Sequence, residues 1–139
     1  MNNLTKAFQE LRGTYHIVSR QNYTCCQTCG CDEMVDLAEK ELAKGKAVNG
    51  MMFYHNQDHE RKEEGQNFRL TYGNLDIDGQ KVGFQTEAVG YIVVSVLSKH
   101  GVETEWNGDA DERILVKTQS IRRLPGMYET RRLRQRLLE

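Results

Sequence analysis

The chain has 139 residues, of which 38% are hydrophobic and 28% are charged, and its formal net charge is −1 at pH 7. This size and composition predict a single domain, residues 1–139, with a core of its own, and no apolar run approaches the length of about 20 residues that a membrane helix needs. Because the first residues also lack the apolar stretch of a secretory signal, we expect a cytoplasmic protein with reduced thiols and no membrane partner.

The first half of the chain is predicted to alternate helices and strands. Apolar residues at helical spacing predict a first helix that Asn2 or Asn3 caps. A second helix is expected to begin at an Asp32 cap and to end before Gly45. The expected elements are a helix up to 13, a strand at 14–19, a helix at 32–44 and a strand at 47–54.

The second half is predicted to contain two β-hairpins and one long, well-buried helix. Asp78-Gly79 and Asn107-Gly108 are dipeptides typical of tight hairpin turns. The long helix opens at Thr86 and is apolar over most of its surface. The expected elements are a loop or short helix at 56–66, strands at 68–72, 75–77 and 81–84, a helix at 86–100, strands at 102–106 and 113–117, and a terminal helix at 127–138.

The order of these elements, α-β-α-β-β-α-β-β-α, predicts the fold class. Helices and strands in this mixture are typical of an α+β fold, with helices packed on a mostly antiparallel sheet. The central β-α-β-β-α-β portion matches the split βαβ order of ferredoxin-like proteins, to which an N-terminal and a C-terminal helix would be added.

Positive charge is concentrated near the C-terminus. Between residues 113 and 139, eight Lys or Arg residues oppose Glu129 and Glu139, which gives a local charge of +6 on a chain of net charge −1. A basic terminal helix could serve as an interaction module for an acidic protein or for nucleic acid, or it could be a solvated surface that neutralises the acidic body. Because no aromatic residues interleave the arginines, nucleic acid is disfavoured, and self-association as a homo-oligomer is left open.

All four cysteines stand within seven residues, in the run Cys-Cys-Gln-Thr-Cys-Gly-Cys at 25–31. Two thiols separated by two residues and followed by glycine have the form of a zinc knuckle. A closed zinc site needs four ligands, and two histidines four residues apart on one helical face could complete it. Zinc is therefore the expected cofactor, and its candidate ligands are Cys26, Cys29, Cys31, His55 and His59.

The same thiols could instead serve an enzyme, either in thiol–disulfide exchange or as a hydrolytic nucleophile. The N-terminus of the following helix would favour a thiolate on Cys29 or Cys31, and Cys26 with His55 could form a nucleophile–base pair. Exchange is disfavoured because the only proline, Pro125, is far along the chain, whereas thioredoxin-like proteins place a cis-proline beside the CxxC sequence. Both enzymatic alternatives remain open at this stage.

Four short motifs are spread along the chain: Cys-Cys-Gln-Thr-Cys-Gly at 25–30, His-Asn-Gln-Asp at 55–58, Tyr72-Gly73, and Glu-Trp-Asn-Gly at 105–108. Through them the chain resembles an uncharacterised bacterial family of domains of unknown function. The resemblance spans nearly the whole chain and implies that the cysteines and the His-x-Gln-Asp segment act together. It makes Cys31 a departure from the family, and it supplies no activity. The candidate binding residues are Cys25, Gln57, Asp58, Tyr72 and Trp106.

The sequence therefore predicts a small protein whose cysteine turn and His-Gln-Asp segment meet in one site. That site would bind zinc or line a ligand pocket. The alternatives are a cysteine-thiolate enzyme and an interaction module that works through the basic terminal helix.

Overall fold

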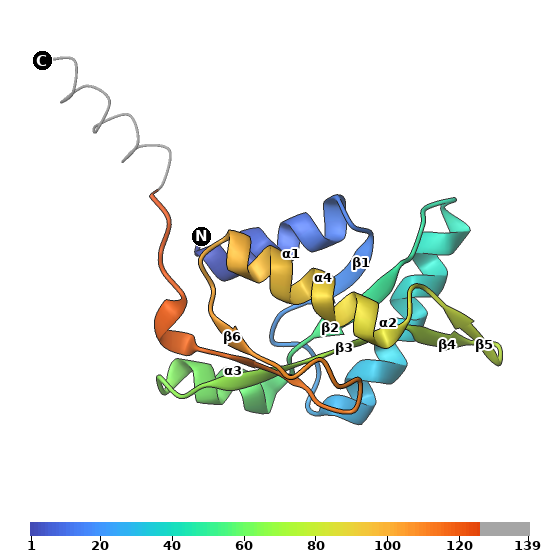
Figure 1. Cartoon of the computed structure of the whole chain (residues 1–139). Helices are drawn as coiled ribbons and strands as arrows, with labels where there is room; N and C mark the ends of the chain where they lie inside the picture. The colour runs from blue at the N-terminus through green and yellow to red at the C-terminus, as the bar shows by residue number, and fades with distance from the viewer. Residues whose placement is uncertain (126–139) are drawn as a thin grey trace, which may run out of the picture.

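The computed structural model describes residues 1–125, so the basic helix predicted at 127–138 lies outside the described residues and stays a prediction. No helix within residues 1–125 is long and apolar enough to span a membrane. The elements of this part (Figure 1) are α1 (Asn3–Gly13), β1 (Ile17–Arg20), α2 (Gln27–Ala43), β2 (Gly50–Phe53), α3 (Asn56–Glu63), β3 (Phe68–Gly73), β4 (Leu75–Ile77), β5 (Gln80–Val82), α4 (Thr86–Lys99), β6 (Thr104–Glu105), β7 (Ile114–Val116) and the short 3-10 helix η1 (Thr118–Ser120).

Five strands form one mixed sheet in the order β1-β2-β3-β7-β6, and β4 and β5 form a separate hairpin. β1 and β2 are parallel, and the other neighbouring strands are antiparallel. Helices α1 and α4 cover one face of the larger sheet, and α2 and α3 lie on the other face (Figure 1). The predicted α+β class, with helices packed on a mostly antiparallel sheet, is therefore confirmed.

The two faces of the sheet have separate apolar cores. Successive strand residues point to opposite faces, so Ile17 packs with α1 and α4, whereas its neighbour Val18 packs with α2. The larger core lies under α1 and α4 and contains Phe8, Met52 and Val93. The smaller core lies under α2 and contains Met34, Ala38, Met51 and Phe53. β1, at the edge of the sheet, is thus held between α1 and α2.

The ferredoxin-like arrangement is not confirmed. In a split βαβ fold, another strand would lie between the two strands that a helix connects, but β1 and β2 are direct neighbours joined through α2. The β4–β5 hairpin also stays outside the main sheet, because its two strands pair only with each other. The place beside β3 is taken by β7, from the C-terminal hairpin.

Local signals placed several elements correctly. Asn2 caps α1, because its side chain accepts a hydrogen bond from the Thr5 backbone N–H. Asp78 and Gly79 have φ angles of 52° and 80°, the left-handed pair that a tight turn requires, and they join β4 to β5 as predicted. The hairpin that pairs β6 with β7 is also present.

The predicted start of α2 at Asp32 is wrong, because Cys26 is the N-cap and the helix begins at Gln27. Gly30 allows the first turn of α2 to pack directly against β2. A Cβ atom at this position would collide with the ring of Phe53, so only glycine allows α2 to approach β2 so closely. The glycine that looked like part of a knuckle turn therefore serves helix-to-strand packing. The helix carries Cys29 and Cys31 in its first turns.

Candidate metal centre

The cysteines follow a tight turn between β1 and α2. Thr24 has a φ angle of 65°, an uncommon left-handed conformation for a β-branched residue, and its hydroxyl donates to the Cys26 carbonyl at 2.9 Å. The Asn22 backbone is also left-handed, with φ of 51°. This turn points the chain into the N-terminus of α2 and places Cys25 just before the helix cap.

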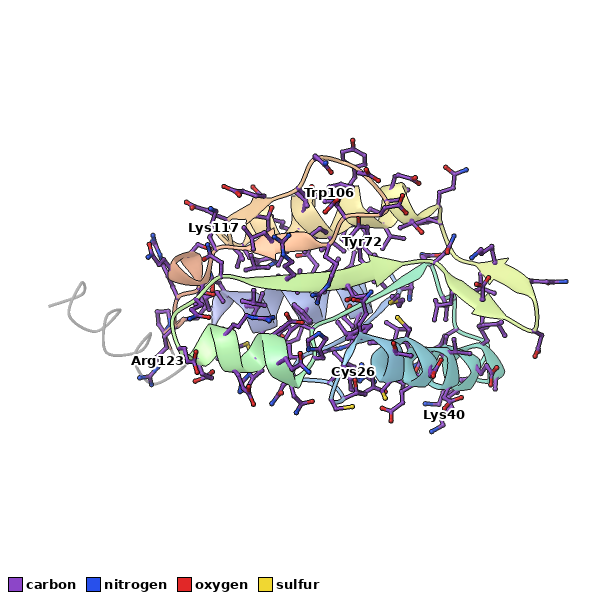
Figure 2. All side chains as sticks on the ribbon, turned by 90° about the horizontal axis from the view of Figure 1, so that it is seen from below. Cys26, Lys40, Tyr72, Trp106, Lys117 and Arg123 are labelled. Atoms are coloured by element: carbon purple, nitrogen blue, oxygen red, sulfur yellow. The ribbon has the colours of Figure 1, made fainter. Side chains whose placement is uncertain are left out.

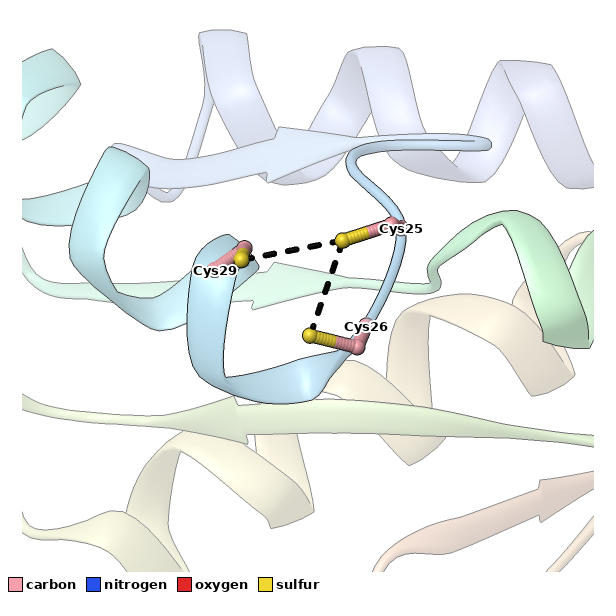
Figure 3. A group of neighbouring side chains, drawn as sticks. All are labelled: Cys25, Cys26 and Cys29. Atoms are coloured by element: carbon pink, nitrogen blue, oxygen red, sulfur yellow. Dashed lines mark hydrogen bonds between the residues drawn. The ribbon is translucent and has the colours of Figure 1, made fainter.

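Three of the four sulfur atoms gather at the start of α2 (Figure 3). Cys25 Sγ lies 3.7 Å from Cys26 Sγ and 3.6 Å from Cys29 Sγ. A tetrahedral zinc ion with Zn–S bonds of about 2.3 Å would hold its sulfur ligands about 3.8 Å apart. The spacing of the thiols therefore already matches an edge of a metal–thiolate tetrahedron.

This group is distinctive in the part of the chain that the structure describes. Cys25, Cys26 and Cys29 form the only set of three or more Cys, His, Asp or Glu residues there whose ligand atoms all lie within 4.8 Å of one another. Cys25 and Cys29 are exposed and Cys26 is half-buried. We call these three residues the thiol cluster. Its exposure leaves one side open to solvent and to a further ligand.

Two of the three thiols have pKa values that are shifted in opposite directions. The pKa of Cys26 is lowered, chiefly because the backbone N–H of Cys29 in the first turn of α2 stabilises its thiolate. Hydrogen bonding from Cys25 and Cys26 raises the pKa of Cys29 to about 11, and the charges of those two sulfurs add to the effect. The first turn of α2 therefore favours a thiolate on Cys26, whereas ionisation of Cys29 is disfavoured until a bound cation compensates its charge.

Cys31 lies apart from the thiol cluster. Its half-buried side chain packs against the smaller core, on the face of α2 that meets the sheet. Burial raises the pKa of its thiol, and the nearby Asp32 acts in the same direction. A residue in this environment behaves as a small apolar side chain, so Cys31 is not among the thiols gathered for a metal.

His55 is a buried residue whose two ring nitrogens both contact Asp58. It caps α3: its Nδ1 accepts from the Asp58 backbone N–H at 3.4 Å, and its Nε2 lies 3.1 Å from Asp58 Oδ2. Burial lowers the pKa of His55, although the charge of Asp58 acts in the opposite direction. The contacts with Asp58 hold the ring at the start of α3, and it is not part of the thiol cluster.

Asp58 is completely buried and ties α3 to the sheet. Its carboxylate accepts from Arg113 Nη2 at 2.7 Å and from Arg61 Nη1 at 3.3 Å. Arg113 also donates to Thr71 Oγ1 and to the Arg69 carbonyl on β3. We call His55, Asp58 and Arg113 the α3 anchor. Its contacts are those of a structural hub.

His59 faces a different environment on α3. Its ring stacks parallel to Tyr54, with the ring centroids 6.4 Å apart, and its Nε2 lies 3.8 Å from Glu63 Oε1. Its Nδ1 is buried without a hydrogen-bond partner in the structure. His59 does not belong to the thiol cluster.

The cysteine turn and the start of α3 are nevertheless neighbours, as the predicted site requires. The Tyr23 backbone N–H donates to the Tyr54 carbonyl, and the Asn56 N–H donates to the Thr24 carbonyl, both at 2.9 Å. The structure thus brings the two backbone segments together, but the sulfurs and the imidazoles do not share one ligand set. These two backbone hydrogen bonds attach the turn that carries the thiol cluster to the end of β2 and the start of α3.

The remaining candidates lie elsewhere. Gln57 is exposed on α3. The Tyr72 hydroxyl and the Trp106 indole N–H both donate to the carbonyls of Asp109 and Glu112, so they hold the loop between β6 and β7. Figure 2 shows Trp106 and Cys26 on opposite sides of the sheet. Tyr72 and Trp106 therefore do not line a pocket with the thiols.

Sequence reasoning missed two residues that shape this region. Arg113 lies 55 residues from Asp58, and its partner could not be identified without the fold. Thr24 gave no signal either, because its left-handed backbone is atypical of its residue type. The close spacing of the cysteines indicated the thiol cluster, but the predicted metal ligands included Cys31, whereas Cys25 was predicted only as a binding residue.

The fold and the site together define a small α+β domain with an exposed cluster of three thiols at a helix N-terminus. The chain belongs to the family described as a domain of unknown function, DUF6891, whose model matches residues 1–124. A comparison with curated proteins found no match, and neither did a comparison with solved structures.

Proposed function

We propose that this protein binds one thiophilic metal ion, zinc in the first place, through the thiolates of Cys25, Cys26 and Cys29. The observation that carries the proposal is the spacing of the three sulfurs, with Cys25 Sγ 3.6 Å and 3.7 Å from its two partners. Thiolates select soft and borderline metal ions over Mg²⁺ or Ca²⁺. Reduced thiols are required, so we place the protein in the reducing cytoplasm.

Metal binding at the thiol cluster is coupled to deprotonation. Hydrogen bonds from Cys25 and Cys26 raise the pKa of Cys29 to about 11, so its proton competes with the metal near neutral pH. A divalent ion displaces this proton and compensates the charges of the three thiolates, which lie close together. Three protein ligands leave a fourth tetrahedral position for water or an exogenous ligand, a pattern typical of exchangeable or catalytic zinc rather than of closed structural sites.

The test is a zinc titration of the metal-free, fully reduced protein against a chromophoric chelator. We expect one equivalent of Zn²⁺, and we expect Cys29→Ser to weaken its affinity by about a hundredfold, because a hydroxyl is a poor replacement for a thiolate. Cys31→Ser is the matched control. It makes the same chemical change two residues further along α2, outside the thiol cluster, and it should leave the affinity within about threefold of the parent protein.

Two results would contradict the proposal. The first is the absence of stoichiometric zinc binding by the reduced parent protein. The second is an equal loss of affinity in Cys29→Ser and Cys31→Ser, which would place the metal elsewhere or assign the effect to folding.

A second candidate function, thiol–disulfide exchange, is supported by the lowered pKa of Cys26. The Cys26 thiolate would attack a substrate disulfide and release one substrate thiolate. A neighbouring thiol, such as Cys29, would then lose its proton, attack the mixed disulfide and release the second substrate thiolate. The substrate is reduced and the cluster is oxidised, so a cellular dithiol would have to regenerate it.

Alkylation kinetics separate this function from metal binding. With iodoacetamide and mass spectrometry of the metal-free protein, we expect Cys26 to be modified fastest at a pH below the ordinary thiol pKa of about 8.5. Uniformly slow alkylation of all four cysteines would contradict exchange chemistry and would leave the metal proposal unaffected.

A further inference from the structure

A pocket of about 560 Å³ lies at the opposite end of α2 from the thiol cluster. Its walls come from the end of α1, the exposed edge of β1 and the second half of α2, which contributes Leu37 and Glu41. Because Leu37 is eleven residues after the Cys26 cap, the pocket begins roughly 16 Å along the helix from the thiols. It is therefore a separate site.

The pocket is built around the free edge of β1, which pairs only with β2. The backbone carbonyls of Ile17 and Ser19, on this edge of β1, already accept hydrogen bonds from side chains. The Ile17 carbonyl accepts from Ser19 Oγ at 2.8 Å, and the Ser19 carbonyl accepts from Arg12 Nη1 at 3.2 Å and from Arg20 Nη1 at 2.9 Å. These side-chain contacts make the edge a poor template for another strand, so a backbone partner is not the expected occupant.

Within residues 1–125, no carboxylate lies within ion-pair distance of the two guanidinium groups that meet at the Ser19 carbonyl, those of Arg12 and Arg20. Partial desolvation lowers the pKa of Arg12, which is exposed at the pocket rim, and the charge of Arg20 adds to the effect. Each guanidinium uses one of its five N–H donors on Ser19, so most donors remain for a ligand.

The rest of the wall adds one more cation and an apolar surface. Lys46 lines the pocket beside Glu41, with which it pairs at 3.6 Å. Val18, Leu37 and Ala47 provide apolar wall atoms. The pocket therefore combines an excess of positive charge with room for a nonpolar group, as sites for small charged organic ligands do.

We propose that this pocket binds a small phosphate monoester, with the phosphate held between Arg12 and Arg20 and the organic part against Val18 and Leu37. Paired guanidinium groups match the planar fork geometry that phosphate oxygens accept. A doubly charged phosphate compensates both arginines, which a single carboxylate would not. The proposal does not rest on metal binding at the thiol cluster.

The test uses phenyl phosphate as the probe and backbone amide shifts as the readout. We expect saturable shifts at Gly13, Val18 and Ala47, and binding about tenfold tighter than that of inorganic phosphate, because the ring buries apolar surface. Benzyl alcohol, which is neutral, should not bind. Arg12→Gln and Arg20→Gln should each weaken phenyl phosphate binding about tenfold or more.

Lys40→Gln is the matched control, because it removes one positive charge from α2 at a position that does not line the pocket. We expect its affinity to stay within about twofold of the parent protein. If an arginine variant misfolds, Arg20→Lys replaces it in the test. This change keeps the positive charge but removes the planar pair of guanidinium donors, so we expect a loss of affinity smaller than that of Arg20→Gln.

Three results would overturn this inference: no saturable binding of phenyl phosphate, an equal loss in Lys40→Gln and the arginine variants, or inorganic phosphate binding as tightly as phenyl phosphate. The last would mean only unspecific ionic attraction. Repeating the titration with Cys29→Ser keeps the two sites distinguishable, since phosphate binding should be unchanged whether or not that variant loses its metal.

Discussion

The thiol cluster and the α3 anchor are neighbouring regions with similar apparent chemistry and opposite roles. Both contain residue types that bind metals, and their backbones are joined by hydrogen bonds between 23–24 and 54–56. The thiols of Cys25 and Cys29 are exposed and make only weak contacts with each other. Asp58 is fully buried, and Arg113 occupies its carboxylate. One region has free ligand atoms and the other has none.

Residue type alone does not identify a metal ligand, because the ligand atom must also have a lone pair that no other contact occupies. His55 was a predicted zinc ligand, but its Nδ1 caps α3 and its Nε2 lies 3.1 Å from Asp58 Oδ2, so the ring is held away from the thiol cluster. The cysteines retain such lone pairs, because the first turn of α2 packs through Gly30 and Cys31 and leaves the other sulfurs outward. The α3 anchor thus stabilises the fold, whereas the sulfur atoms of the thiol cluster are accessible to a ligand or reagent.

The largest effect is expected from breaking the α3 anchor. Arg113→Gln should lower the free energy of unfolding by about 3 kcal/mol, because it leaves the buried Asp58 carboxylate without its closest partner. Arg61→Gln is the control. Arg61 is half-exposed, so its loss should cost less than about 1 kcal/mol. Urea unfolding measures both, and equal losses would contradict the hub role of Arg113.

A smaller effect is expected where the helix that carries the thiols meets the sheet. Gly30→Ala should destabilise the protein by about 1–3 kcal/mol, because its Cβ would collide with Phe53. It should also weaken zinc binding, since the turn that holds Cys26 and Cys29 must move. Gly13→Ala, at the end of α1 with open space around it, should be neutral or stabilising by up to about 1 kcal/mol. Thermal unfolding of the pair checks the sign, and a stable Gly30→Ala protein would refute the packing role.

The smallest effect concerns pH. The folded-state pKa of His55 is lowered by burial below its ordinary value of about 6.5. Between these two values the unfolded chain binds more protons than the folded one, so stability should fall as the pH decreases through this window. His55→Asn keeps a capping acceptor but cannot titrate, so it should show a shallower slope. The free energy of unfolding measured from pH 5 to 8 tests this, and identical slopes would contradict it.

Much of the fold could be predicted from local signals in the sequence. The Asn2 cap and the Asp78-Gly79 turn have short-range causes and lie where they were expected. The start of α2 could not be predicted, because the collision that makes Gly30 necessary comes from Phe53 on another element. The strand order also depends on long-range pairing, such as that of β3 with β7.

The candidate site was predictable to a similar degree. The crowding of the cysteines located the region, but the sequence grouped Cys31 with Cys26 and Cys29, whereas the structure groups Cys25 with them. The separation of Cys31 from them follows from helix geometry, but only once the helix is known to begin at Gln27. Nothing local revealed that Arg113 would occupy Asp58, or that Arg12 and Arg20 would meet at one carbonyl. Contacts between distant elements create those groups.

The proposed metal site has three sulfur ligands and no imidazole ligand. X-ray absorption spectroscopy at the zinc edge of the loaded, reduced protein reports this ligand set. We expect a shell of three sulfur atoms at about 2.3 Å, completed by one light atom from water or buffer. Fewer than three sulfurs, or the multiple-scattering signature of a bound imidazole, would contradict it.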